Sequence, residues 1–283
     1  MRRWGWLFLG PVLVCFVIGF VWPFIQGIYL SFCKFRLIRD AKFIGFGNYL
    51  KAFKDASFGH SFWYTALFAV VSLVLINVLA FMVAYFLTQG IKGSNIFRTV
   101  FFMPNLIGGI VLGYVWKFVF NRAFVAIAKA AGNAAAGSLL STPNGAMFCL
   151  ILVSVWQYAG YMMLIYVAGF MSVSNDVKEA AMIDGCTPSQ AMWNVTVPLM
   201  RSSFVQCIFL SITRCFVVYD VNLSLTKGEP FGSSVMAAMH VYNQAFTYKN
   251  YGLGQAEALI LFIVCAIVGV TQVMVGKKGE VEA

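Results

Sequence analysis

Six long stretches of this sequence are apolar and almost free of charged side chains. A membrane-spanning helix needs about 20 mostly apolar residues, because each residue rises about 1.5 Å through a hydrocarbon core roughly 30 Å thick. Helices are expected there because their backbone groups are hydrogen-bonded within the segment, away from water. The pattern predicts an all-α, polytopic membrane protein with six transmembrane helices in one domain over residues 1–283. The stretches are 7–30, 62–87, 99–120, 146–173, 202–226 and 258–276.

The composition excludes both a soluble protein and a disordered one. Charged residues make up 11% of the 283 residues and hydrophobic residues 61%, whereas soluble domains carry about 25% charged residues to keep their surfaces wetted. The 28 Phe, 12 Tyr and 7 Trp are the reverse of a disordered composition. The net charge of +10 comes from basic residues spread thinly between the apolar stretches, so we expect no nucleic-acid partner.

The segment 174–200, between the fourth and fifth stretches, carries the signals of two short helices. Asp176 and Glu179 have the spacing of a capping box, in which two side chains satisfy the first backbone N–H groups of a helix. Gly185 can adopt the left-handed conformation that commonly ends a helix. A first helix over about 177–184 is therefore predicted.

A second helix is predicted directly after this turn. Thr187 can cap it, with Pro188 at its first position and Gln190 three residues after the cap. The helix should end near Val195, because the residue before Pro198 is disfavoured in the helical region. On these local features alone, the hairpin either packs beneath its own bundle or serves as a docking element.

Three ionisable side chains lie in or beside the last two stretches, where charge is expensive and by default faces a cavity or a partner. Arg214 and Asp220 are six positions apart, which places them about 120° apart on a straight helix, so they should not pair directly. Arg214 is expected to line a wet cavity or to meet a partner chain. Glu257, near the start of the sixth stretch, either has such a role or is solvated at the membrane interface.

The sequence shows no constellation of catalytic or metal-ligating residues. His60 and His240 fall in predicted loops far apart in the chain, and the seven cysteines, an odd number, form no CxxC pair. The phosphate-binding GxxxxGK[ST] pattern of ATPases is not present. We therefore expect a protein that is not an enzyme, with no cofactor of its own, and any ATP that drives it must be hydrolysed by another polypeptide.

The hairpin sequence resembles the EAA signature of the permease subunits of ABC importers. Residues 179–185 read EAAMIDG, and Pro198 follows at the spacing of that signature. The segment LTKGEP at 225–230 resembles an LTxGGP turn of the carbohydrate branch, the maltose, glycerol-phosphate and multiple-sugar type, with Glu229 in place of a glycine. Tyr161, in YMM at 161–163, also fits that branch. The likeness covers nearly the whole chain, to Gly276.

The resemblance implies a type I importer fold and separate roles for this chain and for its partner subunits. The chain would be the transmembrane subunit of an ATP-driven, binding-protein-dependent carbohydrate importer in the cell membrane. Its partners would be a second permease, a dimer of ABC ATPases that binds ATP and magnesium, an extracellular solute-binding protein, a carbohydrate and the lipid bilayer. The coupling residues toward the ATPase would be Glu179, Ala180, Ala181, Ile183, Asp184, Gly185 and Pro198. The alternative for Glu179 is that it only caps its own helix and does not contact the ATPase.

A cytoplasmic hairpin in a six-span chain places both termini in the cytoplasm. With both termini in the cytoplasm, eight Lys and Arg lie inside and ten outside, so the charge distribution slightly favours the opposite orientation. We accept the orientation that the hairpin implies.

The resemblance also implies which residues line the path of the sugar. Sugars are recognised by aromatic faces and planar polar groups, and the fourth and fifth stretches carry both. The implied set is Trp156, Gln157, Tyr158, Tyr161, Ser211, Arg214 and Tyr219. The alternative for each aromatic residue is helix packing or the interfacial belt. The alternative for the whole chain is an ion-coupled secondary transporter or a channel, in which Arg214, Asp220 and Glu257 would relay ions.

Overall fold

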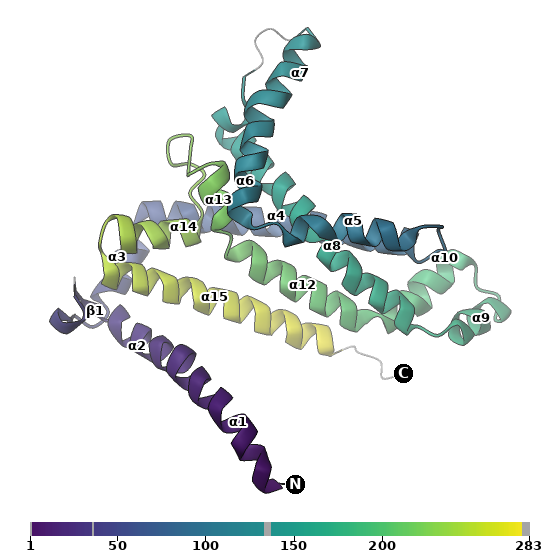
Figure 1. The fold of residues 1–283 in the computed structure, drawn as a ribbon, viewed down its shortest axis with the longest axis horizontal. Coiled ribbons are helices and arrows are strands. Elements are labelled where there is room, and N and C mark those ends of the chain that lie inside the picture. Colours follow the sequence, from purple (N-terminus) through teal and green to yellow (C-terminus); the bar gives the residue numbers. More distant parts are fainter. Residues whose placement is uncertain (1, 36, 133–136, 279–283) are drawn as a thin grey trace. The chain divides into compact units, whose positions relative to one another are not determined.

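The computed structural model describes residues 2–35, 37–132 and 137–278, and these are almost entirely helical (Figure 1). Residues 1 and 279–283, at the two chain ends, lie outside the described part. The described chain divides into two compact units, residues 2–60 with 240–263 and residues 61–239 with 264–278. The expectation of an all-α polytopic fold is confirmed, and the described part adds one small hairpin of two-residue strands.

The first unit begins with a long helix and a compact loop. α1 (Arg2–Phe16) runs through a π-helical turn (Val17–Val21) into α2 (Trp22–Ser31). The strands β1 (Cys33–Lys34) and β2 (Lys42–Phe43) then pair in antiparallel fashion, and α3 (Gly47–Lys54) follows. Asn48 is buried and donates hydrogen bonds to the carbonyls of Ser31 at 2.8 Å and Cys33 at 2.9 Å. These bonds fix α3 against the end of α2.

The remaining helices are α4 (Ala56–Leu87), α5 (Ser94–Leu106), α6 (Gly109–Phe118), α7 (Phe124–Ala130), α8 (Pro143–Ser172), α9 (Asn175–Ile183), α10 (Pro188–Ala191), α11 (Val197–Leu199), α12 (Arg201–Phe216), α13 (Asp220–Leu225), α14 (Ala237–Tyr242) and α15 (Tyr251–Lys277). Further π-helical turns occupy Val119–Ala123, Met192–Thr196 and Asn243–Thr247, and 3-10 turns occupy Ile38–Asp40 and Leu139–Ser141. The helices α4, α14 and α15 each contribute residues to both units.

Five helical segments of the described chain are long and apolar enough to cross a membrane, and a sixth exists if one bent pair counts as a single span. Four agree with predicted stretches, and two of the predictions need correction. The five are Leu9–Ser31, Ala56–Leu87, Gly109–Ala130, Pro143–Ser172 and Tyr251–Gly276, and the bent pair is Pro188–Leu199 with Arg201–Phe216.

The prediction of one continuous helix over 99–120 is wrong. α5 ends at Leu106, the chain is extended at Ile107, and a new helix starts at Gly109 (Figure 1). The new helix continues through a π-helical turn to Ala130, so the apolar segment long enough to span lies further along the chain than predicted. Consecutive glycines at 108 and 109 weaken the helix at this point, because glycine loses the most backbone entropy on becoming helical.

The prediction of one helix over 202–226 is also wrong. α12 ends at Phe216, residues 217–219 are not helical, and α13 starts at Asp220. α13 instead packs on α6: the Ser224 hydroxyl donates to the carbonyls of Asp220 at 2.7 Å and Gly109 at 3.3 Å. A Cβ atom on Gly113 would collide with Ser224. Apolar composition does not reveal this break, because both helices stay in apolar surroundings.

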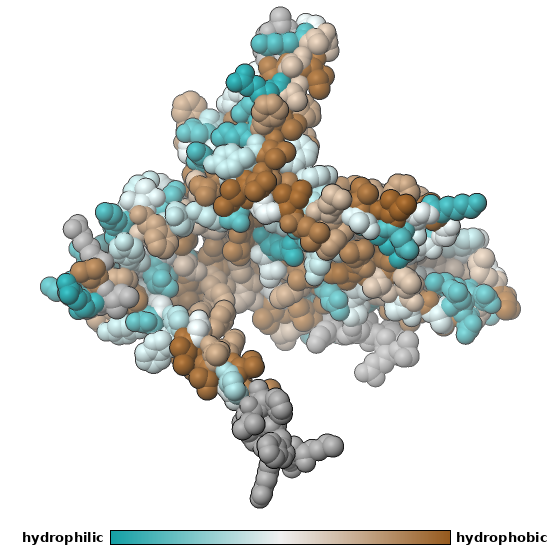
Figure 2. Space-filling model, in the orientation of Figure 1, coloured by the Kyte–Doolittle hydropathy of each residue, from teal (hydrophilic) through white to brown (hydrophobic). Residues whose placement is uncertain are grey.

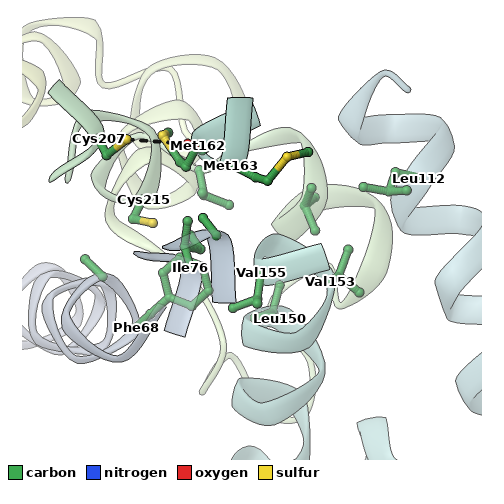
Figure 3. Close-up of a cluster of buried hydrophobic side chains, with 14 of the residues drawn as sticks. Phe68, Ile76, Leu112, Leu150, Val153, Val155, Met162, Met163, Cys207 and Cys215 are labelled. Atoms are coloured by element: carbon green, nitrogen blue, oxygen red, sulfur yellow. Dashed lines mark hydrogen bonds between the residues drawn. The ribbon is translucent and has the colours of Figure 1, made fainter. Parts of the chain in front are cut away.

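A buried core joins α4, α6, α8 and α12 in the second unit (Figure 3). Phe68 and Ile76 of α4 and Leu150 of α8 are fully buried within it. Cys207 of α12 is also fully buried, and its thiol lies 3.6 Å from the Met162 carbonyl of α8. Cys149, Cys207 and Cys215 are free and buried and act as small apolar side chains, whereas Cys15 is exposed and Cys265 is half-buried.

Large hydrophobic side chains also cover much of the outer surface. In the second unit, Figure 2 shows them over α5 and α6, and they include Ile96, Leu106, Val111 and Phe118, each more than half exposed. A soluble monomer rarely exposes an apolar surface of this extent. The outer surface therefore fits contact with lipid tails and with other transmembrane helices.

Gly160→Val should destabilise the second unit. Gly160 of α8 faces the backbone of α5, and a Cβ atom there would collide with the Phe101 carbonyl. The two helices would have to separate, which costs about 1 to 3 kcal/mol or more. We expect a lower midpoint of thermal unfolding for the purified full-length chain in detergent.

The matched control is Gly59→Ala in α4, where an added Cβ has no atom within 4 Å. The close packing of α5 on α8 is contradicted if Gly160→Val unfolds at the same temperature as this control.

Candidate coupling loop and transport path

The hairpin between α8 and α12 has its first helix capped differently from the prediction. The N-cap of α9 is Ser174, whose hydroxyl accepts the N–H of Val177 at 3.4 Å, and Asp176 lies in the first turn instead. The capping box of Asp176 and Glu179 is therefore wrong. Serine is as good a cap as aspartate, and Asp176 still stabilises the first turn through the helix dipole. Glu179 is exposed.

The turn after α9 is as the sequence predicts. Gly185 has a φ of +88°, in the left-handed region. The N–H of Cys186 donates to the Ala181 carbonyl at 3.0 Å, the reach-back bond of a Schellman motif. Thr187 and Gln190 then form a reciprocal capping box, with the N–H of Thr187 donating to Gln190 Oε1 at 2.8 Å. Hydrogen bonds fix both ends of the turn, which limits the conformations that the hairpin can adopt.

The second helix of the hairpin is longer than predicted. It continues beyond Val195 through the π-helical turn and α11 to Leu199, so Pro198 lies inside it. The N–H of Val197 donates to the Met192 carbonyl, five residues back. A widened turn makes room for the proline ring, which clashes with a carbonyl four residues back in a regular α-helix. The axis then bends by 67° at Met200 into α12.

The hairpin has a buried side and an exposed side. Ala181 and Ala191 are buried, and the inner side borders a cavity of about 510 Å³ against the ends of α4 and α8. Ala180, Asp184 and Pro198 are exposed, and the Ile183 side chain is 85% exposed. Figure 2 shows hydrophilic side chains over the end of the unit that carries α9. An apolar Ile183 among exposed polar groups is typical of a docking surface.

A second group of polar and aromatic side chains surrounds Arg214, near the end of α12. The Arg214 guanidinium donates to Asn105 Oδ1 at 2.8 Å, and its central carbon lies 4.8 Å from the ring centre of Tyr161 and 5.1 Å from that of Tyr158. Arg214 and both tyrosines are half-buried. The result is one positive charge held between two aromatic faces, beside the end of α5.

Gln157 of α8 satisfies a backbone group at the break between α5 and α6. Its Nε2 donates to the Ile107 carbonyl at 3.2 Å, and the residue is 5% exposed. A carbonyl released at a helix end inside apolar surroundings needs such a partner. Gln157, Asn105 and Arg214 therefore all act at this break.

Two other residues of the predicted path lie elsewhere. The Ser211 hydroxyl accepts a hydrogen bond from Asn77 Nδ2 at 3.1 Å, and Asn77 Oδ1 accepts one from Tyr166 at 2.8 Å.

Trp156 packs edge to face against Trp116, with 5.5 Å between ring centres, and lines an apolar cavity of about 760 Å³ between α4, α5 and α8. Trp156 and Tyr158 are two residues apart on α8 and point about 160° apart. Tyr219 precedes α13 and is half-buried.

Glu257 does not lie at a solvated interface, and that alternative is wrong. It is 0% exposed in α15, and its Oε2 lies 3.6 Å from His240 Nε2 in the first unit. The prediction that both histidines lie in loops is wrong, because His240 lies in α14 and His60 in α4. Asp55 Oδ2 lies 3.8 Å from the same imidazole nitrogen. No sequence pattern links these three positions, because Asp55 lies far from the other two in the chain and His240 and Glu257 belong to different helices.

Sequence reasoning also missed three buried or half-buried asparagines. Asn77 and Asn105 hold hydrogen bonds described above, and Asn222 is fully buried in α13. Asn222 donates to the Ser234 carbonyl at 2.7 Å and accepts the N–H of Met236 at 3.0 Å, which fixes the loop after α13. The available signal was an uncharged polar residue inside or beside an apolar stretch, since such a group needs a partner when buried.

Several helices long enough to span a membrane, together with an exposed and capped helical hairpin, fit a transport permease. Residues 76–278 match the family described as the binding-protein-dependent transport system inner membrane component. The chain belongs to this family. It is 39% identical over 279 residues to a probable starch degradation products transport system permease protein, AmyD, of Thermoanaerobacterium thermosulfurigenes, which covers 99% of this chain and 96% of that protein.

Another relative and a solved structure agree with this assignment. The multiple sugar-binding transport system permease protein MsmF of Streptococcus mutans is 33% identical over 282 residues, with 99% of this chain and 97% of that protein covered. The crystal structure of a bacterial ABC transporter involved in the import of the acidic polysaccharide alginate matches with a TM-score of 0.84 at 17% identity, over 98% of this chain and 96% of that one. The fold is that of an ABC importer permease, as the resemblance implied.

Arg214 and Asn105 should be energetically coupled. We expect Arg214→Met and Asn105→Ala each to lower the midpoint of thermal unfolding, because each leaves the other partner without its hydrogen bond. The double variant should lose less than the two effects added together. Hydrogen-bonded neighbours typically couple by about 0.5 to 3 kcal/mol.

The cycle is measured by unfolding of the purified full-length chain and its three variants. Thr99→Ala, on the exposed part of α5, combined with Arg214→Met provides an additive control pair. Strict additivity of Arg214→Met and Asn105→Ala would contradict a bond that holds the α5 break.

Proposed function

We propose that this chain is the permease subunit of an ATP-driven importer that carries oligosaccharides across the cell membrane. The observation that carries the proposal is the rigid, doubly capped hairpin of α9 and α10 on a bundle of spanning helices. The names of the two relatives at 39% and 33% identity, with starch degradation products and multiple sugars as cargo, support the substrate class.

The hairpin is the element on which a separate ATPase acts. A dimer of ABC ATPases with bound ATP and magnesium would contact Glu179, Ala180, Ile183 and Asp184 on its exposed side, while buried Ala181 joins it to the bundle. The Gly185 turn and the bend after Pro198 carry a displacement from the hairpin into α12. A rigid hairpin passes on a rigid-body movement, whereas a mobile loop would absorb it. Placing the ATPase there makes this side cytoplasmic, together with both termini.

Ile183→Asp and Gly185→Asp should both abolish ATPase binding and transport while the chain stays folded. Ile183 is 85% exposed, so its replacement removes a docking contact without disturbing the core. Gly185 has a left-handed φ that other residues adopt only with strain. The measurements are co-purification of the ATPase and ATP-dependent uptake into vesicles that contain the complete importer.

Gly132→Asp is the matched control, because Gly132 is also exposed, left-handed and free of atoms within 4 Å of an added Cβ. Normal ATPase binding and uptake by both hairpin variants would overturn the coupling role.

The first span supports a second permease as partner. Its most apolar 18-residue window, within Leu9–Ser31, contains no buried residue. Val12, Ile18, Phe20 and Trp22 are each at least 65% exposed. Within the first unit, this helix therefore has an apolar surface that lipid or a partner bundle could cover. An extracellular solute-binding protein would deliver the sugar to the side of the membrane opposite the hairpin.

The group around Arg214 is the part of the chain best suited to meet a sugar. Tyr158 and Tyr161 offer aromatic faces, and Arg214 offers N–H donors beside them. Tyr219 follows the end of α12, where the helix is broken. Trp156, Gln157 and Ser211 remain part of the proposed path, although their contacts are with Trp116, Ile107 and Asn77.

Tyr158→Leu and Arg214→Gln should lower the uptake of maltotriose by about tenfold or more, equivalent to a loss of about 1.4 kcal/mol of stabilisation. ATPase association should be unchanged, because the hairpin is untouched. The measurement is uptake of labelled sugar by vesicles with the complete importer. Trp156→Leu tests the opposite face of α8 in the same assay.

Tyr114→Leu, on the exposed face of α6, is the control for loss of a tyrosine. If Tyr158→Leu and Arg214→Gln import maltotriose and other short glucans at the rate of this control, the Arg214 group is structural.

A further inference from the structure

Three side chains that the transport proposal does not use converge in the first unit. Asp55 immediately precedes α4, His240 lies in α14 and Glu257 lies in α15. His240 Nε2 lies 3.6 Å from Glu257 Oε2 and 3.8 Å from Asp55 Oδ2. One ligand atom from each residue lies within 4.8 Å of the other two. Two carboxylates and an imidazole thus surround one small volume.

Buried polar atoms of this cluster lack hydrogen-bond partners within the described part of the chain. The side chain of Glu257 is 0% exposed and that of His240 is 9% exposed. Among the residues that the structure describes, neither carboxylate oxygen of Glu257 has a hydrogen-bond partner, and His240 Nε2 has none. A buried carboxylate with both oxygens unsatisfied costs several kcal/mol. The atoms of Glu257 and His240 point to a cationic ligand between them.

The charges and distances favour a divalent cation over a proton. Two carboxyl groups can supply two negative charges to a bound ion, more than the one positive charge that a single imidazole could offset. Charge-assisted hydrogen bonds from N to O measure about 2.7–2.9 Å, shorter than both contacts of His240 Nε2. Ligand atoms about 2.1 Å from a tetrahedral zinc ion lie roughly 3.4 Å from one another, close to the 3.6 Å and 3.8 Å observed.

We propose that Asp55, His240 and Glu257 form a binding site for a divalent transition-metal ion of the zinc type. One imidazole nitrogen and two carboxylate oxygens suit such an ion, since calcium and magnesium prefer oxygen ligands alone. With three protein ligands, a fourth position remains for water.

Neighbouring groups orient the ligands of this site. Asp55 Oδ1 accepts the N–H groups of Ser57 at 2.8 Å and Phe58 at 3.4 Å, which turns Oδ2 toward His240. Gln244 Nε2 donates to Asp55 Oδ2 at 3.4 Å. The Phe58 ring lies 5.7 Å from the imidazole and limits its rotation. Metal ligands in proteins are commonly held by such outer partners.

The ion would connect Asp55 with two helices that lie far from it in the sequence. Asp55 is the residue between α3 and α4, and His240 and Glu257 belong to the last two α-helices. A ligand that binds the folded chain and not the unfolded one stabilises the fold. The bound ion would therefore stabilise the fold, and this effect does not depend on the proposed function.

The test uses the purified full-length chain in detergent, freed of metal with a chelator and then titrated with Zn²⁺ alone. We expect about one zinc per chain by elemental analysis and a higher midpoint of thermal unfolding with zinc than without it. Glu257→Gln and His240→Gln should lose both effects. Gln244→Leu should weaken zinc binding by about 10- to 100-fold, as loss of an outer partner does. His60→Gln, which removes the other histidine of the chain, should bind zinc normally.

A measurement on the unmodified chain keeps the test valid if a variant fails to fold. Co²⁺ bound to this site should give visible absorption bands without the intense near-ultraviolet bands of a cobalt–thiolate bond, and equimolar Zn²⁺ should remove them. Thiolate bands would assign the metal to cysteines and overturn the proposal. The proposal also fails if the unmodified chain binds zinc no more tightly than Glu257→Gln, or if zinc leaves its unfolding midpoint unchanged.

Discussion

The hydrogen bonds of the backbone are the constraint on which the described structure depends. Inside apolar surroundings every N–H and C=O group needs a partner within the protein, because water is not available. A continuous helix meets this requirement by itself. Between α5 and α6 the helix is interrupted, so some backbone carbonyls lack a helical partner. Side chains donate hydrogen bonds to them instead: Gln157 to the Ile107 carbonyl and Ser224 to the Gly109 carbonyl.

This constraint brings together the most interesting residues of the second unit. The break at Ile107 and the break after Phe216 belong to different helices, and the polar groups between them include Arg214, Asn105 and Gln157. Irregular backbone at membrane depth is tolerated where it is covered by protein or lines a cavity. The same residues therefore complete the helix ends and provide the polar surface that we assign to the sugar.

The hairpin follows a different physical rule, because its helices are too short to be stable alone. Helices of this length depend on caps and on packing. Ser174, the Gly185 turn and the box of Thr187 and Gln190 supply the caps, and buried Ala181 supplies a packing contact. These local bonds would supply the stiffness that the proposed coupling role needs. The π-helical turn before Pro198 then carries the second helix to the bend.

The sequence by itself determined the membrane class, the number of apolar segments, the hairpin and its Gly185 turn, because these depend on hydropathy, length and local capping chemistry. The sequence predicted the wrong N-cap for the first hairpin helix and the wrong end for the second. At each point several neighbouring residues are able to cap or end a helix, so local chemistry does not select one of them. Only the tertiary structure decided where the third and fifth apolar segments break. It alone brought Asn105 to Arg214, and Asp55 and His240 to Glu257. Such contacts join residues far apart in the chain, and no local pattern encodes which partner will satisfy a buried polar group.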